Sequence, residues 1–257
     1  MRVAARDGTG LHAEVTGPED GRPVVFANGL GTDLRMWGDM LPHLPDDLRI
    51  LRWDKRGHGR SDVPVGPYSM GMLISDAEAV MEAAGIAGAT FVGLSIGGMI
   101  AQGLAVKRPD LIDRLVLSNT AVKIGTPDLW DARAEAVRTG GMEAVADGAM
   151  ERWFGRDFRA TPGFAEWRAR LVANDPVGYA AGCAAIAGTD FITVTSGLRL
   201  PVLAIAGTED GSTPPDLVRE TADLIPGARF EIIPRAGHLP PVETPEVFAR
   251  LLAGFLP

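Results

Sequence analysis

The chain has 257 residues, of which 46% are hydrophobic and 23% charged, fractions typical of a globular protein with a substantial core. Its formal net charge of −8 argues against a nucleic-acid partner and against binding to an anionic membrane surface, because both are recognised by basic faces. An anionic small-molecule substrate would need a local cation, since the overall field repels it.

Cysteine usage and the first residues favour a cytoplasmic protein. Cys183 is the only cysteine, so the sequence offers neither an internal disulfide nor a cysteine cluster for zinc. The first residues lack the apolar core of a signal peptide. The glycine-rich loops at 29–34 and 57–62 do not match G-x-G-x-x-G. We therefore expect a cytoplasmic protein without a metal or cofactor; a homo-oligomer is possible, and the sequence leaves the oligomeric state open.

Apolar runs separated by turn residues predict strands that alternate with helices along most of the chain. Strands are expected on both sides of Asp7–Gly8 and at 23–27, 49–53, 89–94, 115–117, 202–206 and 230–233. Helices are expected at 70–83, 96–106, 213–224 and 244–254, with Thr213 capping the third. This alternation predicts the α/β class, with a mostly parallel sheet, helices on both faces and ligands at the carboxyl ends of the strands.

The alternation breaks between residues 121 and 195. This segment is rich in Ala, Arg, Glu and Trp and predicts several helices. We expect a core domain formed by residues 1–120 and 196–257, with residues 121–195 inserted over the sheet as a helical cap.

One uncharged segment, residues 83–106, is long enough to cross a bilayer. Its six glycines and its polar residues favour another interpretation. We predict a buried strand, a tight turn and a buried helix there, and no membrane partner.

Gly93-x-Ser95-x-Gly97 lies between this predicted strand and helix. The chain must reverse within a few residues, and the glycines remove side chains that would block the turn. A serine held in such a turn presents its hydroxyl as a nucleophile beside the amides that open a helix. In a chain with 32 glycines the pattern also fits an ordinary strand–helix junction, so the partners of the serine decide.

A serine nucleophile needs a base, and histidine titrates nearest to neutral pH. His238 follows the last predicted strand, so we expect it at the same sheet edge as Ser95. His12 and His43 fit structural positions, and His58, in Arg-Gly-His-Gly, fits a loop-bracing role. The alternative for His238 is a histidine whose hydrogen bonds are satisfied within its own loop.

The base needs a carboxylate that orients it and stabilises its charged form. Glu209 and Asp210 both follow a predicted strand and both qualify. We favour Asp210, because the shorter side chain is held more rigidly in a turn; its alternative is a turn-capping aspartate. The order Ser95, Asp210, His238 is the order of the α/β-hydrolase triad.

A tetrahedral intermediate needs amide donors for its oxyanion. The N–H of Ile96, directly after the nucleophile, is one candidate. The second is the N–H of Leu30, in the loop after the strand at 23–27, where most α/β-hydrolases have His-Gly and this chain has Asn28-Gly29. The alternative for this loop is a simple turn.

With these residues in place, the whole chain resembles the α/β-hydrolases, and more narrowly the 3-oxoadipate enol-lactonases of the β-ketoadipate pathway of aromatic catabolism. The resemblance is carried by residues 28–37, 54–62, 66–69, 93–99 and, most specifically, Ser118-Asn-Thr-Ala-Val-Lys-Ile-Gly-Thr-Pro-Asp-Leu-Trp-Asp-Ala-Arg133. Two places depart from the family pattern: Gly29 replaces a frequent serine, and Pro240–Pro241 replace the usual Ser-Asn.

The resemblance implies cofactor-free hydrolysis of 3-oxoadipate enol-lactone, an anionic small-molecule substrate, to 3-oxoadipate through an acyl-enzyme. The carboxylate of this substrate needs a cation, and we predict Arg133 or Lys123, with Arg133 preferred for its bidentate geometry. Trp130 and Trp153 are expected to wall the pocket. For each of these four residues the alternative is a surface charge or a core tryptophan.

Two other functions remain open from the sequence. The first is a general carboxylesterase, or a cofactor-free perhydrolase of the same fold. The second belongs to another class: a ligand-consuming receptor or a scaffold on a hydrolase fold. An inert scaffold would not need the set of Ser95, Asp210 and His238.

Overall fold

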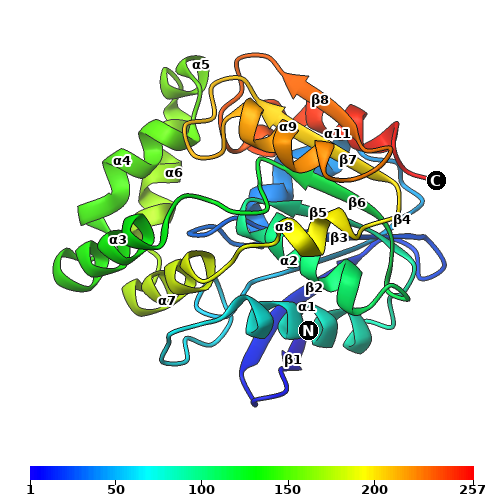
Figure 1. Ribbon diagram of the computed structural model, residues 1–257, viewed down its shortest axis with the longest axis horizontal. Coiled ribbons are helices and arrows are strands. Elements are labelled where there is room, and N and C mark those ends of the chain that lie inside the picture. Colours follow the sequence, from blue (N-terminus) through cyan, green and yellow to red (C-terminus); the bar gives the residue numbers. More distant parts are fainter.

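The computed structural model describes residues 1–257 and contains an eight-stranded sheet in the order β1-β2-β4-β3-β5-β6-β7-β8 (Figure 1). The strands are β1 (Arg2–Ala4), β2 (Gly10–Thr16), β3 (Arg22–Ala27), β4 (Leu48–Trp53), β5 (Ala89–Leu94), β6 (Ile112–Ser118), β7 (Val202–Gly207) and β8 (Arg229–Ile233). Only the β1–β2 and β2–β4 pairs are antiparallel. The predicted α/β class with a mostly parallel sheet is therefore confirmed.

Twelve helical segments accompany this sheet; some cover its two faces, and others lie beside its edge (Figure 1). They are η1, a 3-10 helix (Leu34–His43), α1 (Met70–Ala83), α2 (Ile96–Lys107), α3 (Pro127–Gly140), α4 (Glu143–Trp153), α5 (Arg156–Arg159), α6 (Pro162–Val172), α7 (Pro176–Ala187), α8 (Ile192–Ser196), α9 (Pro215–Asp223), α10 (Pro240–Glu243) and α11 (Pro245–Ala253). α1 and α8 both pack against α2, while η1 packs against α11.

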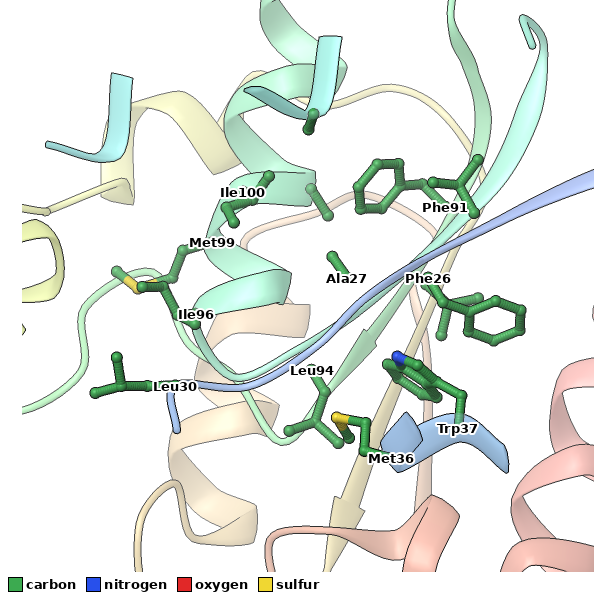
Figure 2. Close-up of a cluster of buried hydrophobic side chains, with 14 of the residues drawn as sticks. Phe26, Ala27, Leu30, Met36, Trp37, Phe91, Leu94, Ile96, Met99 and Ile100 are labelled. Carbon is green, nitrogen blue, oxygen red and sulfur yellow. The ribbon is translucent and has the colours of Figure 1, made fainter. Parts of the chain in front are cut away.

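Alternation along β3 explains why both faces need a cover. Phe26 points to η1, where its ring centroid lies 4.9 Å from that of Trp37. The next residue, Ala27, lies against the start of α2. Figure 2 shows these two sets of side chains, with Ile96 and Met99 of α2 opposite the Phe26–Trp37 pair. Every residue of β5 and β7 is buried, as expected for parallel strands covered on both sides.

The uncharged segment at 83–106 divides as the sequence predicted. Its strand is β5, and its helix is α2, which has 12 residues. No helix in the structure combines the length and the apolar character needed to cross a bilayer.

Helix η1 was not among the helices whose bounds were predicted from the sequence, which predicted a glycine-rich loop after the strand at 23–27. Asp33 caps it, with its carboxylate accepting a hydrogen bond from the N–H of Arg35. Pro42 lies inside this helix, where it removes one backbone donor, so the segment carries a weak helical signal.

The residues between β6 and β7 form six helices. α3, α4, α5, α6 and α7 lie together beside the sheet edge, at the left of Figure 1, and α3 packs extensively on α7. The segment starts and ends at neighbouring points, because the N–H of Phe191 donates to the carbonyl of Val122. α8 instead packs on α2 of the core, with a Thr195–Gln102 hydrogen bond. The boundaries proposed for the core and the cap stay predictions.

Candidate active site

Ser95 occupies the turn between β5 and α2 in a strained conformation, with φ 58° and ψ −121°. Such a conformation costs about 1–3 kcal/mol and persists only where the surroundings enforce it. Here the two glycines are required by space. A Cβ on Gly93 would overlap the carbonyl of Gly97, and a Cβ on Gly97 would overlap the carbonyl of Ala27. The turn therefore holds the serine hydroxyl at the carboxyl edge of the sheet.

His238 and Asp210 lie at this same edge and are hydrogen-bonded to each other. The Nδ1 atom of His238 lies 2.8 Å from Oδ2 of Asp210, and both side chains are buried. With Nδ1 bonded to the carboxylate, Nε2 of His238 is the ring atom left to accept a proton. The N–H of His238 donates to the carbonyl of Trp153, which fixes its loop against α4.

The carboxylate of Asp210 is held by donors on both oxygens. Oδ1 accepts the backbone N–H groups of Ser212 and Thr213, at 2.7 and 3.0 Å. Oδ2 accepts, besides His238, the hydroxyl of Thr213 at 2.8 Å and Nδ2 of Asn119 at 2.9 Å. Burial alone would raise the pKa of Asp210, but the charge and hydrogen bond of His238, with these donors, lower it. The carboxylate therefore stays ionised beside the histidine.

Two of these partners correct or extend the sequence analysis. Thr213 does not cap α9, because its hydroxyl is engaged by Asp210 and the helix begins only at Pro215. The sequence analysis did not single out Asn119, yet its side-chain amide donates to Asp210 and to the carbonyl of Gly237. Its place at the carboxyl end of β6 was the signal that could have identified it.

Glu209, the other candidate carboxylate, points away from the histidine. It accepts hydrogen bonds from the N–H and the side chain of Arg156 at 2.7 Å. The geometry therefore favours Asp210 as the partner of His238.

Ser95 and His238 line one cavity of about 110 Å³. No hydrogen bond joins the two side chains, as is common before a substrate tightens the site. The other residues that line this cavity come from five segments, and most of them are apolar side chains or glycines. They are Leu30, Ile124, Gly125, Leu129, Trp130, Arg133, Arg152, Trp153, Tyr179, Gly211 and Ser212.

Both predicted oxyanion donors are available at this cavity. Neither the N–H of Leu30 nor that of Ile96 donates to another backbone group or to a side chain. Leu30 lies directly after Gly29, where an added Cβ would lie 3.7 Å from Cβ of Ser95. Leu30 and Ile96 thus keep free amide N–H groups in the loop next to Ser95 and directly after it, as a pair of oxyanion donors must.

Hydrogen bonds to its carbonyl oxygen hold the Gly29–Leu30 peptide in place. Its carbonyl accepts Nζ of Lys55 and the hydroxyl of Thr32, each at 2.8 Å. In a trans peptide the N–H points opposite to the carbonyl, so these bonds set the direction of the Leu30 N–H. Lys55 is fully buried, and burial lowers its pKa to about 7.

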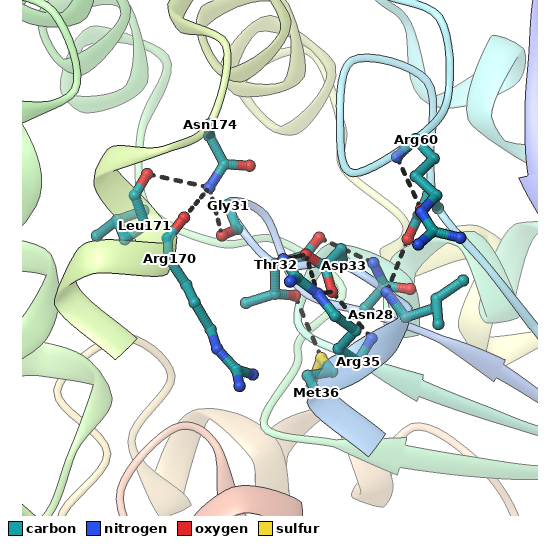
Figure 3. A network of polar contacts seen from close by, with 12 residues as sticks. Asn28, Gly31, Thr32, Asp33, Arg35, Met36, Arg60, Arg170, Leu171 and Asn174 are labelled. Atoms are coloured by element: carbon teal, nitrogen blue, oxygen red, sulfur yellow. Dashed lines mark hydrogen bonds and ion pairs between the residues drawn. The ribbon is translucent and has the colours of Figure 1, made fainter. Parts of the chain in front are cut away.

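His58 braces the same loop, as its sequence context predicted. Its Nε2 accepts the N–H of Gly31 at 2.9 Å, and Nδ1 lies 3.2 Å from the carbonyl of Arg56. Burial, followed by the charge of Lys55, lowers the pKa of His58 to about 3, so this ring is neutral. Asn174, from the segment after α6, donates to the carbonyl of Gly31 and joins the loop to the cap (Figure 3).

The predicted carboxylate-binding residues separate into two groups. Arg133 lines the cavity, with its guanidinium 4.5 Å from the ring of Trp130, and Trp130 and Trp153 form part of the wall. Lys123 does not line the cavity. It is half-exposed and pairs with Asp190 at 3.2 Å, so the expectation that it binds substrate does not fit the structure.

Arg152, at the end of α4, is a second cation in the cavity that the sequence analysis missed. Nothing in its local sequence distinguishes it from other arginines of the segment. Only the packing of α4 over the sheet edge brings it to Ser95.

A larger hollow, of about 450 Å³, lies on the other side of the loop at 29–34. Charged groups line it, including Asp33, Asp54 and Arg170, and Figure 3 shows the Asp33–Arg35 pair of this region. We place the chemistry in the smaller cavity, because Ser95 and His238 line that one and not the larger hollow.

Comparisons with known proteins agree with this geometry. A family model described as the alpha/beta hydrolase family matches residues 24–251. The 3-oxoadipate enol-lactonase 2 of Acinetobacter baylyi is 35% identical, over 93% of this chain and 90% of that protein. The structure of the enol-lactonase from Burkholderia xenovorans LB400 matches with a TM-score of 0.95 and 38% identity, over 100% of this chain and 99% of that one. A malate-bound thermophilic esterase from Thermogutta terrifontis matches with a TM-score of 0.93 and 30% identity, over 100% and 97%. The resemblance found in the sequence is confirmed, and the chain belongs to the alpha/beta hydrolase family.

Proposed function

We propose that this protein is a serine hydrolase that opens 3-oxoadipate enol-lactone to 3-oxoadipate, with Ser95, His238 and Asp210 as its catalytic triad. One observation carries the proposal: the strained Ser95 shares a basic, acid-free cavity with a histidine that is bonded to a buried carboxylate. The similarity to enol-lactonases supports the choice of lactone.

In the first step, His238 takes the hydroxyl proton of Ser95 as Oγ attacks the lactone carbonyl. The N–H groups of Leu30 and Ile96 stabilise the resulting oxyanion. Collapse of the intermediate breaks the ring C–O bond and releases an enolate oxygen, which His238 protonates. The enol then tautomerises to the ketone, still attached to Ser95 as an ester.

In the second step, His238 removes a proton from water, which adds to the acyl carbonyl. The oxyanion forms again beside Leu30 and Ile96, and its collapse breaks the bond to Ser95. The proton held by His238 returns to the serine oxygen, and 3-oxoadipate leaves. Asp210 keeps the imidazole oriented and stabilises its charged form in both steps.

Arg133 is the residue that we assign to the substrate carboxylate, with Trp130 and Trp153 as apolar walls. The guanidinium lies over the ring of Trp130, a contact that restricts its position, and a guanidinium can form bidentate hydrogen bonds to a carboxylate. The malate in the Thermogutta esterase structure shows that a related hydrolase binds a carboxylic acid, which supports this assignment.

The direct test is a spectrophotometric assay with enzymatically generated 3-oxoadipate enol-lactone. We expect rapid loss of lactone absorbance with the wild type and none above background with Ser95→Ala. Arg133→Ala should raise KM for the lactone far more than for a neutral ester. No loss of absorbance at micromolar enzyme would reject the lactonase proposal, and equal KM effects on both substrates would reject the role of Arg133.

A general carboxylesterase is the second candidate, because the Thermogutta relative is an esterase. A panel of neutral esters separates the two, since a lactonase should strongly prefer the anionic lactone. A cofactor-free perhydrolase would be identified in the same panel by peracid formation from hydrogen peroxide. A ligand-consuming receptor would show slow, near-single turnover, whereas fast turnover that Ser95→Ala abolishes supports the enzyme.

A further inference from the structure

Two arginines, Arg133 of α3 and Arg152 of α4, line the cavity of Ser95 together. No aspartate or glutamate lines it. Other arginines of the cap, such as Arg156 and Arg168, form ion pairs with carboxylates, and neither cavity arginine does so. The two cations are therefore uncompensated within the protein.

This arrangement is unfavourable in the unliganded protein. Both arginines are half-buried, and burial, followed by the charge of Arg133, lowers the pKa of Arg152 below its ordinary value. Two like charges in a small, partly apolar cavity repel each other and lose hydration. A cation removed from water is ordinarily paired with an anion. Two arginines that lack a carboxylate partner beside a nucleophile therefore indicate that a ligand supplies the anion.

A carboxylate is the anion that best fits between these two arginines. It has two oxygens, each of which can accept from a different guanidinium, and it removes the repulsion between them. The stacking of Arg133 on Trp130 leaves that cation pre-oriented. Arg152 supplies the second donor from the neighbouring helix.

The small volume of the cavity indicates which part of a substrate carries this carboxylate. Whatever stays bonded to Ser95 after the first step remains in the same space of about 110 Å³ as the two arginines. The alcohol leaves at that stage. A subsite built into this space therefore holds a carboxylate of the acyl portion throughout both steps.

We propose that Arg133 and Arg152 form one subsite for a carboxylate on the acyl portion of the substrate, and that the protein consequently hydrolyses half-esters of linear dicarboxylic acids. This inference rests on the proposed serine hydrolase function and adds Arg152 and a wider substrate class to it. The reaction is balanced by water alone: Ser95 forms an ester with the acyl group, His238 gives its proton to the leaving alcohol, and water releases the free dicarboxylate.

The test compares two esters with the same leaving group and the same six-carbon acyl length: p-nitrophenyl hydrogen adipate, which is anionic, and p-nitrophenyl hexanoate, which is neutral. Release of p-nitrophenol is followed after subtraction of the spontaneous rate. The variants are Arg152→Gln, Arg133→Gln, the double variant and Arg152→Lys. Arg138→Gln, which removes an exposed charge from α3, is the matched control.

We expect the wild type to prefer the adipate half-ester in kcat/KM. Arg152→Gln should lower kcat/KM for the half-ester by roughly 10- to 100-fold, mainly through KM, the range expected for loss of a charged hydrogen bond. The same variant should lose much less of its hexanoate turnover than of its half-ester turnover, and the remaining hexanoate activity shows that it folds. Arg152→Lys should recover part of the loss. The double variant should lose less than the product of the single losses, because both groups bind one carboxylate.

Three results would overturn the proposal. One is a wild type that does not prefer the adipate half-ester. Another is an Arg152→Gln variant that loses both esters equally. The third is a preference for a carboxylate on the alcohol side, as in carboxymethyl hexanoate. If these occur while Ser95→Ala still abolishes hexanoate turnover, the subsite fails and the serine hydrolase function stands. Ester turnover that persists in Ser95→Ala would instead overturn the function on which the subsite rests.

Discussion

Lys55 gives the sharpest quantitative prediction. Its burial lowers the stability of the folded protein, whereas its hydrogen bond to the Gly29 carbonyl is expected to support catalysis. Its ammonium is fully buried and bonds only to the carbonyls of Gly29 and Thr32. Burial lowers its pKa from 10.5 to about 7. Since a tenfold change in proton affinity is worth about 1.4 kcal/mol, the charged lysine costs the folded state roughly 5 kcal/mol.

The change is Lys55→Met, which keeps an unbranched side chain and removes the charge. At about pH 7 the variant should lose that penalty and give up about 1–1.5 kcal/mol of hydrogen bonding. Gly29 retains the hydroxyl of Thr32, and the Thr32 carbonyl retains Nδ2 of Asn28, so neither carbonyl is left without a donor. The net result is a gain in unfolding free energy of about 3 kcal/mol.

The sign of the pH dependence follows from the lowered pKa. Unfolded Lys55 stays protonated up to about 10.5, whereas the folded protein loses this proton near 7. Between these values the unfolded chain holds more protons, so this group makes the wild type more stable as pH rises. The advantage of Lys55→Met should therefore shrink to about zero near pH 9.5.

Whereas Lys55→Met should gain stability, it should lose catalytic activity. Without Nζ of Lys55, the Gly29 carbonyl keeps only the hydroxyl and the N–H of Thr32 as donors, so the Gly29–Leu30 peptide is held less firmly. We expect kcat for ester hydrolysis to fall about tenfold, less than for complete loss of an oxyanion donor.

Urea unfolding at about pH 7 and 9.5, with Lys123→Met as an exposed-lysine control, measures the stability arm. Equal destabilisation at both pH values would refute the burial penalty. A stabilised variant with unchanged kcat would refute the positioning of the oxyanion peptide.

Three further predictions follow from the site. Asp210→Asn should lower kcat by about 10⁴-fold, because an amide does not hold His238 in the required tautomer. Glu209→Gln should change kcat by less than about twofold. Similar losses for both variants in an ester assay would contradict the assignment of Asp210. The pKa of Asp210 lies below its ordinary 3.8, so its carboxylate adds stability that is present above that pH and lost as pH falls. In urea titrations, the difference in unfolding free energy between wild type and Asp210→Asn should therefore shrink toward acid pH. A constant difference would contradict this. Gly97→Ala should cost at least about 3 kcal/mol in thermal unfolding, because the added Cβ overlaps the β3 backbone, whereas Gly38→Ala, with open space, should be nearly neutral; equal melting temperatures would show that the turn relaxes.

The sequence by itself determined the fold class and the tight turn at Ser95. Alternating apolar runs and helical segments have few arrangements other than a parallel sheet covered on both faces. The Gly93–Gly97 spacing is a local requirement, since the overlap that a Cβ would cause involves backbone within the turn and the adjacent strand. Ser95 and His238 could be placed at one edge because each follows a parallel strand, and such strands end on the same side.

The sequence could not determine which polar groups surround these residues. Asn119 reaches Asp210 only because β6 and β7 are neighbours in the sheet, and Lys55 reaches Gly29 only because β3 and β4 are. Sequence distance gives no measure of such contacts. The choice between Glu209 and Asp210 could be argued from side-chain length, but the Arg156 partner of Glu209 became visible only in the structure.

The cap shows the same limit most clearly. Its composition predicted helices, and composition carries no information about which helix faces lie over the sheet edge. The sequence analysis selected Lys123 and did not consider Arg152, yet Arg152 lines the cavity where α3, α4 and α7 pack together, while Lys123 pairs with Asp190 outside it. Local sequence thus determined the turn at Ser95, and long-range packing decided which cations line the cavity beside it.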